Sequence, residues 1–277
     1  MQRLILFVFC CWVASAMALA DSRVEVEQGG VARWDADGIE ACGMDGRTFR
    51  PVDGSCWFPV DFGRRPGHVE IAAYLRGGAS ETGWLVITER EFETQEIEFP
   101  DDRFVDLSPE DLARHHREQA KVKPLFRRGW STPPLFTLPL GPPSDNLPEG
   151  GGFGARRIFN GEPKNPHTGT DYAIPAGTAV KAVEAGKVAL VEEHFFSGLA
   201  TYVNHGHGLV SMYFHMQEAP LEAGAMVEKG DALGEVGSTG RSTGPHLHLG
   251  LRWRGARIDP DWLRDRFGEI PAVQPAP

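Results

Sequence analysis

The sequence predicts an all-β protein: a small antiparallel β domain, then one helix and a proline-rich connector, then a second β-sheet domain. Its 277 residues include 33 glycines and 21 prolines, a content that favours many turns and short strands over a helical bundle. Hydrophobic residues make up 41% and charged residues 24%, the mixture of a globular protein with a buried core. This length gives room for two modest domains.

The first 20 residues have the three-part layout of a secretory signal peptide. Arg3 precedes an apolar run over residues 4–12, and Ala18 and Ala20 form an A-x-A cleavage site. An uncleaved membrane anchor is the alternative, but the small-residue ending favours cleavage. No later stretch reaches the roughly 18 apolar residues that span a bilayer. We therefore expect an exported mature chain with no transmembrane segment, in the periplasm or, as the alternative, secreted.

Charge and cysteine content narrow the possible partners and the redox environment. The formal net charge is -10, which disfavours binding to nucleic acid phosphates. Cys10 and Cys11 belong to the signal peptide, so the mature chain retains Cys42 and Cys56. Two thiols in an oxidising compartment predict a disulfide, which we expect to staple a β-hairpin.

Residues 21–104 are expected to form the N-terminal β domain, and 105–148 the connection to the next domain. Short β-rich runs separated by Gly, Pro and Asp lie at residues 56–60, 69–74, 83–88 and 92–99. Ser108 is then a helix N-cap followed by Pro109 and a stretch without breakers to Lys121, which predicts one helix. Residues 124–148 contain seven prolines and predict an extended connector, laid along a surface or covering the functional groove.

Residues 149–267 predict the second β domain, and 268–277 a C-terminal tail. We find no helical period here. Alternating runs, with Gly or Pro at most junctions, lie at residues 170–174, 179–183, 187–192, 200–204, 209–215, 232–236 and 246–253.

Histidine clustering is the most informative feature of this second domain. It holds seven of the ten histidines: His167, His194, His205, His207, His215, His246 and His248. His246 and His248 are two residues apart, so on a strand their rings face the same way. His167 and Asp171 would be about 13 Å apart on a straight strand. Gly169 lies between them and permits a turn that brings them together.

The combination of these side chains favours a metal site over a set of unrelated surface histidines. Two imidazoles and one carboxylate, without thiolate, favour Zn²⁺ with a fourth position open to water, the coordination of a catalytic site. Such zinc activates water and polarises an amide carbonyl, so hydrolysis is the chemistry implied. The helical H-E-x-x-H motif is absent, and the remaining histidines can move protons instead.

The region from about Glu149 to Leu263 resembles the lysostaphin/LytM-type zinc metallopeptidases, which are peptidoglycan endopeptidases. The resemblance is carried by His167-x-x-x-Asp171, His215 and the run GRSTGPHLH at 240–248, and by the phrases at 157–160, 175–178, 185–188 and 204–208. It implies that His167, Asp171 and His248 bind zinc and that His215 and His246 are the catalytic pair. His246 would be the general base, and His215 would stabilise or protonate the tetrahedral intermediate.

The resemblance further implies an exported zinc metalloendopeptidase that hydrolyses peptide cross-links or stem-peptide amides of peptidoglycan. The N-terminal domain is more weakly similar to the β domain that precedes the peptidase in some exported bacterial members. Two alternatives stay open. One is a non-enzymatic wall-binding or hydrolase-activating module. The other is a biotinyl/lipoyl-like carrier, suggested by the turns at Lys187 and Lys229 but lacking the Met-Lys pair of such carriers.

Several polar residues have less specific interpretations. His205 and His207 are expected to serve a structural turn. Arg157 and Asn160 either touch substrate or the open metal position, or serve no site. His194 is expected to be a half-exposed histidine at a strand end. His68, His115 and His116 are expected to be solvated, and Ser242 and Thr243 to bond to the backbone of a turn.

Overall fold

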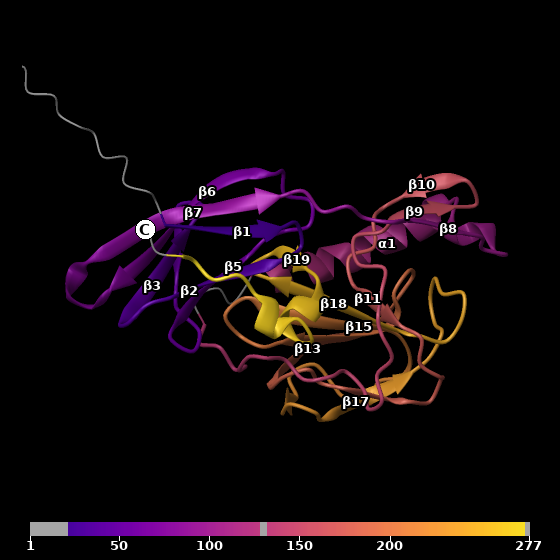
Figure 1. Ribbon diagram of the computed structural model, residues 1–277. Coiled ribbons are helices and arrows are strands. Elements are labelled where there is room, and N and C mark those ends of the chain that lie inside the picture. The colour runs from indigo at the N-terminus through magenta and orange to yellow at the C-terminus, as the bar shows by residue number, and fades with distance from the viewer. Residues whose placement is uncertain (1–21, 128–131, 275–277) are drawn as a thin grey trace, which may run out of the picture.

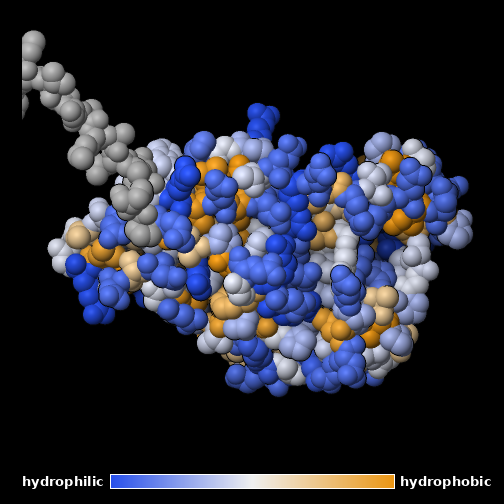
Figure 2. Space-filling view, viewed as in Figure 1, coloured by the Kyte–Doolittle hydropathy of each residue, from blue (hydrophilic) through white to orange (hydrophobic). Residues whose placement is uncertain are grey.

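A computed structural model describes residues 22–127 and 132–274, and its strands and single α-helix confirm the predicted all-β class (Figure 1). The expected signal peptide lies outside the described residues. Within the described ranges, no helix is long and apolar enough to cross a bilayer. Figure 2 shows a largely polar surface on the viewed face, with apolar residues in separate patches.

The N-terminal β domain consists of a five-stranded sheet and a two-stranded sheet. The larger sheet has the order β1 (Ser22–Glu27), β7 (Ser80–Thr88), β6 (Gly67–Leu75), β3 (Ile39–Met44) and β4 (Arg47–Phe49), and the smaller pairs β2 (Val31–Asp35) with β5 (Ser55–Pro59). One pairing departs from the expected antiparallel domain, because β1 and β7 are parallel. Parallel neighbours need a long crossover between them, and here the whole of β2 to β6 supplies it.

The predicted disulfide between Cys42 and Cys56 is present, but it does not staple a hairpin. Cys42 lies on β3 of the larger sheet and Cys56 on β5 of the smaller one. Both half-cystines are fully buried in a core that includes Trp34, Phe58 and Leu85. The bridge therefore joins the two sheets of the domain across their shared core.

Removing this bridge should destabilise the N-terminal domain. The cysteines are 14 residues apart, and closing a loop of that size in the unfolded chain corresponds to about 3 kcal/mol of stability. We expect Cys42→Ala/Cys56→Ala to lower the free energy of unfolding by about this amount in denaturant titrations. The wild-type chain under reducing conditions should show a similar loss. Equal stabilities of the oxidised chain and the variant would contradict this role.

The helix forms where the sequence predicts it, as α1 (Pro109–Val122). The Ser108 hydroxyl accepts the Asp111 backbone N–H at 3.1 Å, so the N-cap is real. A 3-10 turn, η3 (Lys123–Phe126), continues the helix. Val122 is buried there against Tyr202 and other side chains of the second domain. The helix is thus fixed to the second domain.

The second domain is built on a nine-stranded sheet, as its alternating runs predict. Its main path is β11 (Thr170–Tyr172), β18 (Leu247–Trp253), β15 (Leu209–Glu218), β14 (Gly198–Asn204), β13 (Gly186–His194) and β16 (Met226–Val227), with β12 (Ala179–Lys181), β17 (Ala232–Val236) and β19 (Ala256–Ile258) attached. The neighbours along this path are antiparallel.

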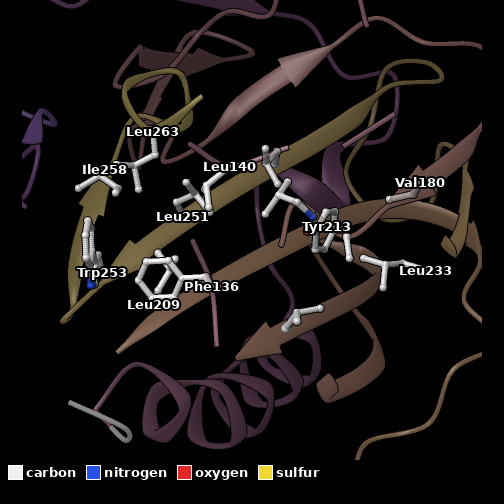
Figure 3. Close-up of a cluster of buried hydrophobic side chains, with 14 of the residues drawn as sticks. Phe136, Leu140, Val180, Leu209, Tyr213, Leu233, Leu251, Trp253, Ile258 and Leu263 are labelled. Carbon is white, nitrogen blue, oxygen red and sulfur yellow. Dashed lines mark hydrogen bonds between the residues drawn. The ribbon is translucent and has the colours of Figure 1, made fainter. Parts of the chain in front are cut away.

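The two faces of this sheet have different surroundings. Leu247, Leu249 and Leu251 of β18 enter the main hydrophobic core, in which Figure 3 labels Leu251. His248 alternates with these leucines along the strand and so lies on the opposite face. The proline-rich connector supplies Phe136 and Leu140 to the same core.

The connector is therefore extended and lies along a surface. This was the first of the two expectations from the sequence. Leu135 donates its backbone N–H to His205 at 2.7 Å, and Gly141 donates to Val183 at 2.7 Å. The alternative expectation, that the connector covers the functional groove, stays a prediction. Phe136 and Leu140 pack on the core face, whereas Leu125 and Phe126, at the start of the connector, pack with Phe214 on the His248 face.

A third sheet links the segment before the helix to the second domain. It has the order β10 (Glu162–Lys164), β9 (Arg156–Phe159) and β8 (Thr94–Ile97), with β8 and β9 parallel. The remaining 3-10 turns are η1 (Arg76–Gly78), η2 (Asp102–Phe104), η4 (Pro260–Leu263) and η5 (Phe267–Glu269). After η5 the chain returns to the N-terminal domain, where Gln274 donates its backbone N–H to Arg23 at 3.1 Å.

Candidate metal centre

Strand register brings together the three side chains predicted to bind a metal. Asp171 on β11 lies directly opposite His248 on β18, and His167 comes from the loop before β11. His248 Nδ1 lies 2.8 Å from Asp171 Oδ1 and 2.8 Å from His167 Nε2. His167 Nε2 lies 3.0 Å from Asp171 Oδ1. Among the described residues, these three form the group of His, Cys, Asp and Glu side chains able to hold a metal ion.

Gly169 allows the His167 loop to approach the His248 strand closely. It does not form the turn that the sequence suggested. Its φ is outside the left-handed region. A Cβ at this position would lie 2.5 Å from His248 Nε2 and 2.5 Å from the Leu249 carbonyl oxygen. The missing side chain therefore lets the His167 loop approach the His248 strand.

Neighbouring groups orient each of the three side chains. His167 donates Nδ1–H to the Gly152 carbonyl at 2.7 Å, which leaves the lone pair of Nε2 facing the other two residues. The Phe214 ring stacks on His248 at 5.0 Å with an interplanar angle of 3°. The Arg157 guanidinium donates to Asp171 Oδ2 at 3.1 Å. The donor atoms are thus held in place by a second layer of contacts.

Burial and hydrogen bonding set the protonation of these groups. Burial raises the pKa of Asp171, but the close contacts with His167 and His248 outweigh it and hold the pKa well below its usual range. Burial lowers the pKa of His248 to about 4, against the opposing effect of Asp171. The centre therefore presents a carboxylate and a neutral His248 ring at neutral pH, which are the forms that bind metal.

The donor set fits a zinc ion. Tetrahedral zinc with bonds of about 2.0–2.1 Å places neighbouring donor atoms about 3.3 Å apart. The three donors here are separated by 2.8 to 3.0 Å, so a small relaxation would accommodate the ion. Two imidazoles and one carboxylate leave a fourth position for water, as catalytic zinc requires.

His215 and His246 lie beside this centre, as the sequence analysis expects of the catalytic pair. Their ring centroids are 4.6 Å apart, and the His215 ring is 6.2 Å from that of His248. The side chain of His246 is 19% exposed, and its Nε2 lies 3.9 Å from Asp171 Oδ1. Solvent therefore reaches the site beside His246.

A β-bulge directs His215 toward the site. On β15 the residues Leu209 and Tyr213 enter the main core, and Met212 and Phe214 pack on the other face. Regular alternation would send His215 into the core. Instead its φ is +63°, and the pairing with β14 slips by one residue at this point. The left-handed backbone thus places His215 on the His248 side of the sheet.

The hydrogen bonds of the pair fix which ring nitrogens can accept a proton. His215 donates Nδ1–H to the Thr239 carbonyl at 2.8 Å, and His246 donates Nδ1–H to the Gly244 carbonyl at 2.8 Å. In both neutral rings Nε2 then carries the lone pair. Burial, with further contributions from His246 and His248, lowers the pKa of His215 to about 3.

His205 has the structural role expected of it. It is fully buried, its Nδ1–H donates to the Ala185 carbonyl at 2.8 Å, and its Nε2 lies 2.7 Å from the Ser211 hydroxyl. His207 is also fully buried, with Nε2 accepting from Arg254 at 3.0 Å. Both histidines therefore fix the turn between β14 and β15.

His205 should make the stability of the fold sensitive to acid. Burial lowers its pKa to about 4, whereas the unfolded value is about 6.5. Its contribution is complete above pH 6.5 and is lost as the pH falls from about 6.5 to 4, because only the unfolded chain takes up the proton. This corresponds to about 3 kcal/mol.

Urea unfolding measured across that window provides the test. His205→Gln should lose about 3 kcal/mol less stability than wild type between pH 7 and 4. The matched control is His116→Gln on the exposed surface of α1, which should follow the wild type. Identical pH profiles for wild type and His205→Gln would contradict this origin of acid sensitivity.

Other residues singled out in the sequence have clear positions. The Asn160 amide donates to the Phe99 carbonyl at 3.0 Å and accepts the Phe99 N–H at 2.7 Å, so it serves the loop structure. His194 is 4% exposed, not half-exposed, and lies 3.3 Å from the Tyr202 hydroxyl. The side chain of His115 is only partly solvated, because its ring packs 4.9 Å from Phe196.

The remaining positions agree with the simpler interpretations. The Ser242 hydroxyl donates to the Gly244 carbonyl at 2.7 Å, which is a turn contact and not a nucleophile arrangement. Lys187 lies within β13, and Lys229 forms an ion pair with Glu184 at 2.8 Å. Neither lysine is presented as a free acceptor at a hairpin tip, so the carrier alternative gains no support.

One contributor to the site was missed from sequence. Phe214 is positioned against His248 by the pairing of β15 with β18, and no local pattern reveals that pairing.

An all-β domain in which a His/Asp/His group converges beside two further histidines defines a metallopeptidase-type domain. Residues 165–260 match the family model described as Peptidase family M23, so this part of the chain is an M23 domain. This confirms the resemblance to lysostaphin/LytM-type peptidases.

Individual relatives agree with this assignment. The chain is 37% identical over 94 residues to the peptidoglycan DD-endopeptidase ShyA of Vibrio cholerae, a match covering 34% of this chain and 22% of ShyA. It is 42% identical over 94 residues to the DD-carboxypeptidase/endopeptidase Mpg of Neisseria meningitidis, with the same coverages. The matched region thus spans about a fifth of the length of these curated relatives.

One solved structure is similar over most of the chain. It is a Pseudomonas aeruginosa chain described as a peptidase M23, with 29% identity and a TM-score of 0.65. The match covers 85% of this chain and 93% of that chain. The similarity therefore extends well beyond the residues that match the M23 family model.

Proposed function

We propose that the chain is an exported zinc metalloendopeptidase that hydrolyses peptide cross-links or stem-peptide amides in bacterial peptidoglycan. The main support is that donor atoms of His167, Asp171 and His248 lie within 3.0 Å of one another. The rings of His215 and His246 lie beside them. The substrate class is supported by the relatives that are peptidoglycan DD-endopeptidases. The signal-like residues 1–20 support export.

The organisation that supports this activity has two domains. We propose residues 21–104 as an N-terminal β domain and 149–267 as the peptidase domain, joined by the helix and connector at 105–148, with 268–277 as a tail. The N-terminal domain would position the peptidase relative to the wall.

In the proposed chemistry the metal has one role, and His215 and His246, which do not bind it, have another. Bound zinc would supply a Lewis acid that activates water and polarises the scissile carbonyl. His246 Nε2 would accept a proton from the attacking water, because it carries a lone pair and its side chain is reachable by solvent. His215 Nε2 would face the reacting carbonyl from the buried side and take part in proton transfer to the leaving amine.

Digestion of purified peptidoglycan by the mature full-length protein tests this function. We expect mass spectrometry to show cross-linked muropeptides converted into monomers, with loss of activity after dialysis against a chelator and recovery on adding zinc. Stoichiometric zinc binding without any change in the muropeptides would instead favour the non-enzymatic wall-binding or activating module.

A further inference from the structure

Arg157 is one cation beside the candidate metal centre, and Arg241 is a second. Arg241 has no acidic partner among the described residues. The Arg241 guanidinium carbon lies 4.3 Å from the ring centroid of Phe196 and 4.7 Å from that of Phe159. In residues 22–127 and 132–274, Arg241 forms no ion pair, and its side chain has no hydrogen bond. The two rings therefore hold a guanidinium in place while its donors stay available.

The backbone and the neighbours place this guanidinium near Arg157, which bonds to Asp171. The Arg241 backbone N–H donates to the Phe196 carbonyl at 2.9 Å, and His246 follows five residues later. Arg157 lies near the same Phe159 ring, at 6.0 Å from its centroid, and bonds to Asp171. Arg241 thus lies on the side of the centre where Arg157 contacts the metal-ligating carboxylate.

The local charge balance favours an anionic ligand. Burial, with a further contribution from Arg157, lowers the pKa of Arg241 to about 10, so it remains charged at neutral pH. The Asp171 carboxylate nearby already accepts a hydrogen bond from Arg157, and ring nitrogens of His167 and His248 lie within 3.0 Å of it. A partly buried cation that lacks a counter-charge is stabilised when a ligand supplies a carboxylate.

We propose that Arg241 binds a substrate carboxylate on the carbon attached to the scissile nitrogen, and so selects peptide bonds whose leaving residue carries a free carboxylate. This inference rests on the proposed function and specifies its substrate class. A D-alanyl bond to the D-centre of diaminopimelate, or to a terminal D-alanine, has such a carboxylate. A glycine bridge has none beside its internal bonds. The subsite therefore favours the D-alanyl class of bond over glycine bridges.

A matched pair of peptides tests the subsite. We would compare diacetyl-Lys-D-Ala-D-Ala with its C-terminal carboxamide as substrates of the zinc-loaded full-length chain, and as ligands of the metal-free chain in calorimetry. Because a charge-assisted hydrogen bond is involved, wild type should prefer the acid about 10- to 100-fold, in kcat/KM and in affinity. Arg241→Gln should abolish this preference without lowering kcat/KM or affinity for the carboxamide peptide.

Two further variants make the result specific. Arg241→Lys keeps the charge but loses the planar fork, so it should retain only part of the preference. Arg252→Gln is the matched control, since Arg252 also stacks on an aromatic ring, that of Phe126 at 4.4 Å, and should keep the full preference. Thermal unfolding checks that each variant is folded.

The outcomes separate this inference from the proposed function. Cleavage of muropeptides with equal acid and amide binding by wild type, or with an unchanged preference in Arg241→Gln and Arg241→Lys, overturns the subsite and leaves the peptidase. Carboxylate-dependent binding that disappears in Arg241→Gln, without turnover of peptides or peptidoglycan, supports the subsite while contradicting the peptidase. The absence of both hydrolysis and carboxylate-dependent binding contradicts both.

Discussion

Replacing His248 by alanine is expected to abolish peptidoglycan hydrolysis and to weaken zinc binding by more than about 100-fold. Loss of a second-layer contact costs about 10- to 100-fold in metal affinity or activity, and loss of a ligand should cost more. His248 Nδ1 lies 2.8 Å from both His167 Nε2 and Asp171 Oδ1, so removing this ring disrupts the whole centre and not a single contact. Metal analysis and muropeptide digestion of the purified variant would measure the two effects.

Phe214→Leu provides a graded companion to this variant. It keeps all three donors and removes the ring stacked on His248, so we expect an intermediate loss of about 10- to 100-fold. His116→Ala, on the exposed side of α1, should behave as wild type. Full activity of His248→Ala would refute the assignment of the metal ligands.

Replacing His246 by alanine should reduce kcat/KM about 10²- to 10⁴-fold while one equivalent of zinc stays bound. This range is typical of losing a general base. Zinc should remain because His246 Nε2 is 3.9 Å from Asp171 Oδ1, whereas the ligand donors are within 3.0 Å of one another. The expected signature is therefore loss of turnover with retention of metal.

Parallel measurement of zinc content and hydrolysis distinguishes this result from a damaged centre. Loss of zinc from His246→Ala would indicate that His246 is a ligand. Activity within about threefold of wild type would show that His246 is not the general base, since general bases contribute at least about 100-fold. Either observation would change the proposed division of roles between His246 and His215.

Local sequence signals predicted much of this fold. The Ser108 N-cap and the absence of breakers located α1 to within a residue of its observed end. The i, i+2 spacing of His246 and His248 correctly placed both rings at one site, although β18 begins at Leu247 and His246 directly precedes it. The convergence of His167 and Asp171 was also predicted, although its cause is the lack of a side chain at Gly169 and not a left-handed turn.

Features that depend on long-range pairing could not be derived in this way. The parallel β1–β7 pair, the disulfide between two sheets and the β8–β9 pair each join segments whose partnership no local pattern encodes. His215 is the clearest case within the site. Its position depends on a bulge set by the register of β14 against β15, and positive φ is uncommon for any non-glycine residue, so sequence alone does not locate it.

Zinc-edge X-ray absorption of the full-length protein, loaded with one equivalent of zinc, tests the central claim most directly. We predict a four-coordinate ion with two imidazole nitrogens and oxygen ligands at about 2.0–2.1 Å, and loss of one imidazole shell in His248→Ala. A spectrum without imidazole scattering, or one unchanged by His248→Ala, would contradict the proposed centre.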